Sequence, residues 1–129
     1  MATIAGEGKT SRQINAEIKG LFASGEEKIV VTDPGARHNL GVAVLTPSHL
    51  RFEGSVGYYC AGLIDGPTIE VAGSAGWGLA ESMKEGRVVV EGHAGNGAAA
   101  AIRGGTVVIH GDAAARLGVA MKGGLVLVG

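Results

Sequence analysis

Residues 54–129 divide into four units of 19 residues: GSVGYYCAGLIDGPTIEVA (54–72), GSAGWGLAESMKEGRVVVE (73–91), GHAGNGAAAAIRGGTVVIH (92–110) and GDAAARLGVAMKGGLVLVG (111–129). Each unit begins with a glycine, which we number position 0: Gly54, Gly73, Gly92 and Gly111. Position 3 repeats a glycine at Gly57, Gly76 and Gly95, and position 7 is always small, ending with Gly118. A fixed period of this length is typical of solenoid proteins, in which each repeat forms one coil.

The apolar positions predict a strand in every coil. Positions 15 and 17 share one face of a strand, because residues two apart point to the same side. They hold Ile69 and Val71, Val88 and Val90, Val107 and Ile109, and Val126 and Val128. Positions 2, 6 and 10 are also apolar, and position 13 supplies a second corner glycine in three units. We therefore expect an all-β fold, a parallel β-helix whose coils pair at about 4.8 Å.

Composition agrees with a coil built from small residues. Glycine takes 24 of 129 positions and aromatic residues make up only 4%, so short aliphatic side chains must fill the interior. With 3 prolines and no Gly-X-Y period, a collagen helix is excluded. A hydrophobic content of 46% excludes a disordered chain.

Residues 1–34 depart from the repeat and are predicted to cap the solenoid. A run of apolar residues has helical spacing: Ile14, Ile18, Leu21 and Phe22. We expect Ser11 to be the N-cap of this helix and Gly25 to end it. Lys28 to Thr32 is predicted to form a strand.

The β-helix domain is predicted to span residues 35–129. Its first coil is degenerate, with apolar residues expected inside at positions 7, 10, 15 and 17: Val42, Leu45, Leu50 and Phe52. Gly129 occupies position 18, so the sequence ends within the solenoid. Because an open ladder edge is adhesive, we expect that another chain covers it, a second copy included, or that the sequence is part of a longer protein.

Charge and targeting signals exclude some classes of partner. The net charge of -1 gives no electrostatic footprint for nucleic acid. No apolar run approaches the length of a membrane span, and no signal peptide is visible. The one cysteine, Cys60, cannot form an intrachain disulfide, which fits a reducing compartment. We therefore expect a cytoplasmic protein.

Two glycine-rich motifs resemble phosphate-binding sequences without completing them. Gly6 to Thr10 (GEGKT) lacks the first glycine of a phosphate loop, where Thr3 stands, and we predict no strand before it. Gly95-Asn96-Gly97 follows a strand, but the segment from Ala98 to Arg103 is too short for the crossover helix of a dinucleotide site. The 19-residue repeat explains these last glycines better.

Titratable residues predict no catalytic, cofactor-binding or metal-binding site in this chain. Histidines 38, 49, 93 and 110 share no metal-ligand spacing, and His93 and His110 fall at solvent-facing turn positions. Cys60 shares position 6 with Leu79 and Leu117, so a packed core thiol is expected.

Position 16 gives the first candidate contact surface. Its neighbours at positions 15 and 17 point inward, so its own side chains point outward. Val89, Val108 and Leu127 hold this position and predict an apolar stripe outside the coil. The stripe either binds a partner or lies beneath the N-terminal helix.

Two further surfaces are candidates for contact with a partner. Position 11 forms a basic ladder of Lys84, Arg103 and Lys122, which is either solvated or meets an acidic partner. Positions 4 and 5 gather most of the aromatic residues: Tyr58, Tyr59 and Trp77.

The G-x-x-G-x-x-x-[AG] pattern resembles the GXGXG domain at the C-terminal end of glutamate synthase large subunits. It reads Gly73-Ser74-Ala75-Gly76 with Ala80, Gly92-His93-Ala94-Gly95 with Ala99, and Gly111 with Gly118. The stretch Val56-Gly57-Tyr58-Tyr59-Cys60-Ala61-Gly62 is closest to the stand-alone GXGXG subunit of N-methylglutamate synthase, also called methylamine–glutamate N-methyltransferase. The resemblance covers about residues 35 to 129 well and the N-terminal helix loosely.

The resemblance implies a right-handed β-helix without catalytic residues, part of a glutamate-synthase-like oxidoreductase complex. Such a subunit would space a glutamine-amidotransferase-like subunit from a synthase subunit that carries FMN and an iron–sulfur cluster. Two alternatives stay open. One is a scaffold like the β-helical subunit of formylmethanofuran dehydrogenase, which the GXGXG module also resembles. The other is an independent enzyme or binding module with a site on the solenoid surface.

Overall fold

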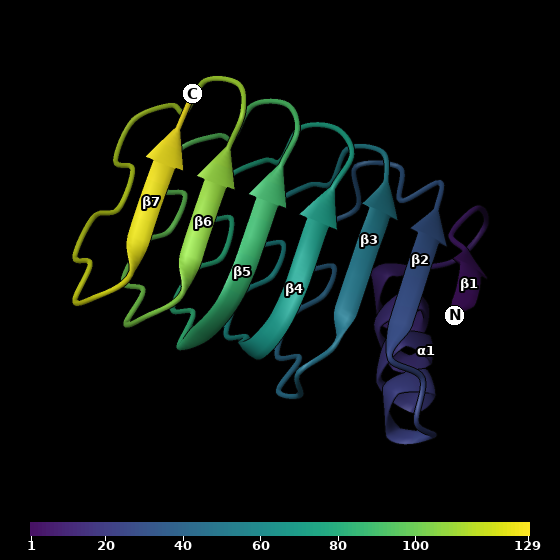
Figure 1. Ribbon diagram of the computed structural model, residues 1–129. Helices are drawn as coiled ribbons and strands as arrows, with labels where there is room; N and C mark the ends of the chain where they lie inside the picture. The colour runs from purple at the N-terminus through teal and green to yellow at the C-terminus, as the bar shows by residue number, and fades with distance from the viewer.

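In the computed structural model, which describes residues 1–129, equal positions of successive units lie side by side. Ile69 pairs with Val88, and Val88 pairs with Val107, across parallel strands. The chain therefore winds as a right-handed β-solenoid of about five turns (Figure 1), and the predicted β-helix is confirmed.

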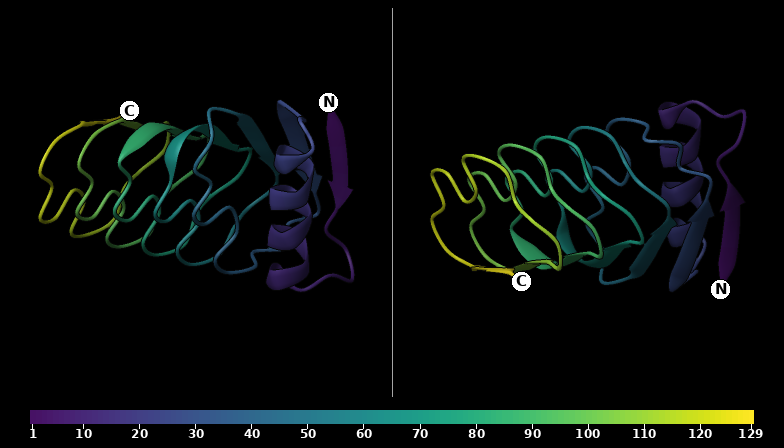
Figure 2. Two further views of the ribbon diagram at one scale, coloured as in Figure 1. Left: turned by 90° about the horizontal axis from the view of Figure 1, so that it is seen from below. Right: turned by 90° about the horizontal axis from the view of Figure 1, so that it is seen from above.

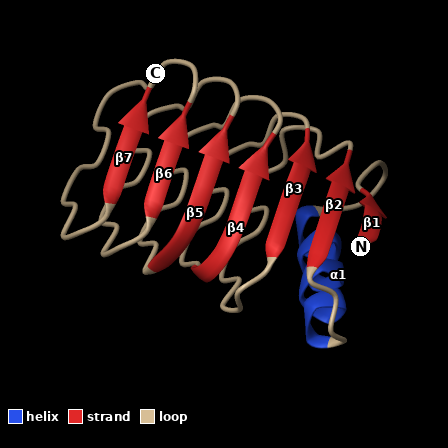
Figure 3. Ribbon diagram, viewed as in Figure 1, coloured by secondary structure: helices blue, strands red, loops and turns tan.

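Seven strands and one helix make up the molecule. The strands form one parallel sheet in chain order: β1 (Ala2–Ala5), β2 (Lys28–Thr32), β3 (His49–Glu53), β4 (Asp65–Val71), β5 (Glu85–Val90), β6 (Thr106–Ile109) and β7 (Leu125–Val128). The helix α1 (Ser11–Ala23) lies at the N-terminal end of the sheet (Figure 3). No helix is long and apolar enough to cross a lipid bilayer.

The predicted inward positions form the core. At positions 15 and 17, the side chains of β4, β5 and β6 are fully buried. On another wall of the coil, single parallel bridges join Val56, Ala75, Ala94 and Ala113. No polar or charged residue is buried. In the last coil, Leu117 and Val128 are partly exposed, because no further coil packs on them.

The side of the coil opposite the sheet is built from turns (Figure 2). We call it the turn face; it comprises residues 38–46, 58–64, 77–84, 96–103 and 115–122. Its residues at position 7 have left-handed backbones, with φ of 59° at Ala61 and 57° at Ala80. The N–H of Ala61 donates to the preceding coil and that of Leu63 to the following coil. This side of the coil is thereby hydrogen-bonded like a ladder without being a strand.

The corner glycines are required because neighbouring backbones nearly touch. The N–H of Gly92 donates to the carbonyl oxygen of Gly73 at 2.8 Å. A Cβ atom on Gly92 would lie 2.7 Å from that same oxygen, closer than a real side chain approaches. An alanine there would push two coils apart.

The N-terminal segment differs from expectation in two details. The N-cap is Thr10 and not Ser11, because the Thr10 hydroxyl accepts from the N–H of Gln13 and the Gln13 side chain accepts from the N–H of Thr10. A strand, β1, does precede the GEGKT sequence, where none was expected. It is held by parallel pairing to β2. The remainder is confirmed: Ile14 and Ile18 are buried, and Gly25 follows the helix with a positive φ.

Asn15 of α1 supplies hydrogen bonds to the first coil that a preceding coil supplies elsewhere in the solenoid. In later coils the N–H at position 7 donates to the preceding coil, as Ala61 does to the carbonyl of Leu40. In the first coil the corresponding residue is Gly41, and no earlier turn segment lies beside it. Its N–H donates instead to Asn15 Oδ1 at 2.9 Å, while Asn15 Nδ2 donates to the carbonyl of Asn39 at 2.8 Å. One side-chain amide thus satisfies two backbone groups of the end coil.

The first coil also corrects two inward positions. Leu45 was expected inside but is 65% exposed, and Val44 is buried instead. The N–H of Asp65 donates to the carbonyl of Val44, in the place where Lys84 donates to Ile64 one coil later. The first coil therefore holds one extra residue before β3, and Gly41 takes the buried place expected for Val42. Leu50 and Phe52 are buried as predicted.

We expect Asn15→Ala to lower the free energy of unfolding by about 1–2 kcal/mol, because it leaves two backbone groups without partners. Asn15→Asp keeps the acceptor for Gly41 but sets a carboxylate oxygen against the carbonyl oxygen of Asn39, so it should not restore the wild-type stability. Urea unfolding checks both variants against Arg12→Ala, an exposed change on the same helix. Equal stabilities of Asn15→Ala and Arg12→Ala would contradict the capping role.

We expect Gly92→Ala to lower the free energy of unfolding by about 1–3 kcal/mol, because its Cβ must displace a neighbouring backbone. Gly20→Ala is the matched control, since nothing lies within 4 Å of its added Cβ. In the middle of a helix it should stabilise by about 0.5–1 kcal/mol. Thermal and urea unfolding measure both. If Gly92→Ala were neutral, close backbone approach would not explain the glycine repeat.

Candidate functional site

The sheet face carries the predicted apolar stripe. Val89 on β5 and Val108 on β6 are half-buried, and Leu127 on β7 is 49% exposed, all between inward-pointing neighbours. Cover by the N-terminal helix is wrong: α1 packs near β1 at the far end of the sheet, as Figures 1 and 2 show. The stripe therefore faces outward without cover from this chain.

The other half of the sheet face is charged. Arg51 on β3 lies 3.1 Å from a carboxylate oxygen of Glu53, 3.7 Å from Glu70 and 3.4 Å from Glu91. His49 contacts Glu70 directly. Partial burial disfavours the charged guanidinium, but the hydrogen bond to Glu53 and the surrounding carboxylates outweigh it and raise the pKa of Arg51.

This network was not predicted, although the outward positions 14, 16 and 18 of the first coil, all on β3, hold His49, Arg51 and Glu53. It makes the sheet face two-part, with paired charges on β3 and β4 and an apolar stripe on β5 to β7.

The turn face brings the predicted aromatic residues together. The rings of Tyr58 and Trp77 stack with centroids 5.4 Å apart and planes 19° apart. His38 adds a third ring at 4.5 Å from Tyr58, a neighbour that the sequence did not indicate. Tyr59 lies beside this stack and extends over Gly78, where a Cβ would lie 2.5 Å from Tyr59 Cδ1.

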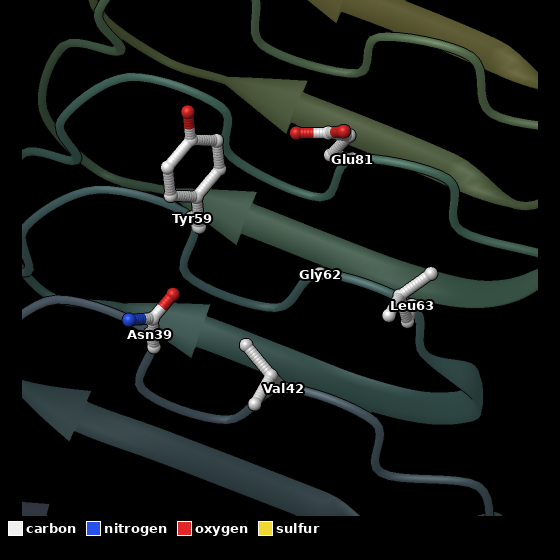
Figure 4. Close-up of a pocket in the computed structure, with 6 residues that line it drawn as sticks. All are labelled: Asn39, Val42, Tyr59, Gly62, Leu63 and Glu81. Atoms are coloured by element: carbon white, nitrogen blue, oxygen red, sulfur yellow. The ribbon is translucent and has the colours of Figure 1, made fainter.

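Tyr59 separates two open depressions on the turn face. The first has a volume of about 350 Å³ and is lined by Asn39, Val42, Tyr59, Gly62, Leu63 and Glu81. Figure 4 shows the ring of Tyr59 and the Glu81 carboxylate on one side of Gly62, with Val42 and Asn39 on the other. The second, of about 490 Å³, shares Tyr59 and Glu81 and adds Trp77, Asn96, Arg116 and Val119.

The residues of the basic ladder form a column of exposed side chains. The backbone N–H groups of Arg103 and Lys122 donate to Met83 and Ile102 of the preceding coils, which keeps the column in register. Lys84, Arg103 and Lys122 line a third depression of about 270 Å³, together with Leu63 and Ser82. None of the three cations makes an ion pair within the chain.

Polar side chains at position 1 form a ladder of acceptors. Ser55 Oγ accepts from the N–H of Ser74, Ser74 Oγ from that of His93, and His93 Nδ1 from that of Asp112. His93 is solvent-facing, as expected, but it also holds the next coil, which requires an unprotonated Nδ1. These hydrogen bonds hold neighbouring coils together and account for the polar residues at position 1 without a catalytic role.

Cys60 is a core thiol, as predicted. It is fully buried, and burial raises the pKa of its thiol to about 12. Elsewhere, no three His, Cys, Asp or Glu side chains converge as metal ligands.

We expect Cys60 to resist Ellman's reagent at pH 8 in the folded protein, because the thiolate is the reactive form and the raised pKa suppresses it. The same thiol should react fully in denaturing urea. Absorbance at the wavelength of the released thiolate measures both. Rapid reaction of the native chain would show that the first coils open readily.

Comparison with family models, with curated proteins and with solved structures finds no match to this chain. The likeness of residues 35–129 to the GXGXG domain therefore stays a prediction from the repeat. The candidate contact surfaces are the apolar stripe on the sheet face and the aromatic and basic residues of the turn face.

Proposed function

We propose that the chain is a non-catalytic structural subunit of a glutamate-synthase-like complex. The observation that carries the scaffold role is the apolar stripe of Val89, Val108 and Leu127 on the outer face of the sheet. The repeated glycine pattern, through its resemblance to the GXGXG domain, carries the choice of complex.

A spacer must be stiff and must offer a surface to its partners. Stiffness follows from hydrogen bonds between every coil and the next, on the sheet and on the turn face alike. The sheet face offers apolar side chains repeated at about 4.8 Å, next to charged residues that already pair among themselves. An outward apolar stripe with a polar border has the character of a protein interface.

In this proposal the chemistry belongs to the partners. The amidotransferase-like subunit releases ammonia, and the synthase subunit with FMN and an iron–sulfur cluster consumes it. The solenoid holds the two sites at a fixed separation.

We expect Val89→Asp and Val108→Asp to weaken partner binding at least about tenfold, because a charge would be buried at the interface. The isolated variants should still fold, since both side chains point out of the coil. Val30→Asp is the matched control, at the equivalent outward place on β2, where Val30 pairs with Arg51 and lies outside the stripe.

The measurement is gentle purification of the tagged native protein, with mass spectrometry of the co-purifying chains and the flavin absorbance of the same sample. Recovery of an amidotransferase-like chain and a flavin-bearing chain supports the proposal. A folded Val108→Asp protein that assembles normally removes the stripe from it. A wild-type protein that purifies alone and without flavin contradicts the complex itself.

A further inference from the structure

We propose that the turn face is a second docking surface and that its occupant is an acidic segment of a partner protein carrying aromatic or aliphatic side chains. The surface comprises Tyr59, Leu63, Trp77 and Val119 as apolar contacts and Lys84, Arg103, Arg116 and Lys122 as cations. It does not depend on the glutamate-synthase assignment.

The charges of the turn face are unbalanced. Arg51 on the sheet face lies among three carboxylates, whereas none of the four cations of the turn face has an ion-pair partner. The last two turn segments, 96–103 and 115–122, hold Arg103, Arg116 and Lys122 and no Asp or Glu. The whole chain is slightly acidic, at -1, so this face is positive against its own background.

Stacking of the coils brings cations of the turn face close to one another. In-register coils place Arg103 and Lys122 in one column about 4.8 Å apart at the backbone, where their charges repel. Solvent weakens this repulsion but does not turn it into attraction. A partner carboxylate lying along the column would relieve it, which makes an acidic occupant the complementary one.

Large apolar and aromatic side chains are exposed on the turn face. Trp77 is 53% exposed and Leu63 is 62% exposed, in a chain with few aromatic residues. Tryptophan, tyrosine and arginine are the residue types that most often dominate protein–protein binding energy. All three types lie on this face, at Trp77, Tyr59 and Arg116.

The three depressions make these groups one surface. Tyr59 and Glu81 line both the first and the second, and Leu63 lines both the first and the third. The depression in Figure 4 has room for one large apolar side chain between Tyr59 and Leu63. Glu81 disfavours acidic groups at that point, so the apolar anchors of the occupant lie over the second and third coils. Its carboxylates lie over Arg103, Arg116 and Lys122.

The test uses the full chain and a synthetic peptide that carries Leu and Phe in one half and Glu in the other. Binding is followed by NMR amide shifts and the indole N–H signal of Trp77. We expect shifts at Trp77, Arg103 and Arg116. Arg103→Glu combined with Lys122→Glu should weaken binding about tenfold or more. Lys28→Glu, an exposed charge reversal on β2, is the control and should bind normally.

Three outcomes would overturn the proposal. One is the absence of shifts on the turn face. Another is equal binding of a control peptide with Ser in place of Leu and Phe, which would show that charge alone acts. The third is tighter binding of single-stranded oligothymidylate, which would identify a nucleic-acid surface. Val89→Asp should leave peptide binding unchanged, so that failure of the sheet face and of the turn face can be told apart.

Discussion

Backbone hydrogen bonding between equal positions of neighbouring coils is the constraint on which the rest of this molecule depends. It places Val88 beside Ile69 and Val107, so each inward column must hold similar small apolar residues. It brings Gly92 within 2.8 Å of Gly73, which leaves no room for a side chain. It also stacks outward residues into columns, and this turns a repeated valine into a stripe and a repeated cation into a basic ladder.

The same constraint decides what could be predicted from sequence. Columns that repeat over four units revealed the strands, the core and the outward stripe. The prediction for the first coil was wrong at Leu45, because one extra residue before β3 shifts the inward position to Val44. The spacing of the glycines does not reveal this extra residue. Asn15 could not be recognised, since it acts once, at an end where no repeat exists. His38 and His93 were expected to be ordinary surface residues, but the Nδ1 atom of each also accepts a backbone hydrogen bond, from the N–H of Tyr58 and of Asp112 respectively.

The opposite faces of the solenoid differ in kind. The sheet face combines a charged network, whose residues pair with one another, with an apolar stripe. The apolar side chains are therefore the groups on this face that lack a partner. The turn face combines exposed aromatic residues with cations that have no ion-pair partner. Negatively charged groups of a partner would therefore complement this face. The two surfaces differ in chemistry, and a continuous hydrogen-bonded framework holds them at a fixed separation. This arrangement suits the proposed spacer between two unlike partners.

The most direct test of this account is a cryo-electron microscopy structure of the gently purified native complex. We expect one subunit on the sheet face over β5 to β7 and a different subunit on the turn face near Trp77 and Arg103. Density for partners on only one face, or a ligand in place of a partner between Tyr59 and Leu63, would contradict the role of a two-sided spacer.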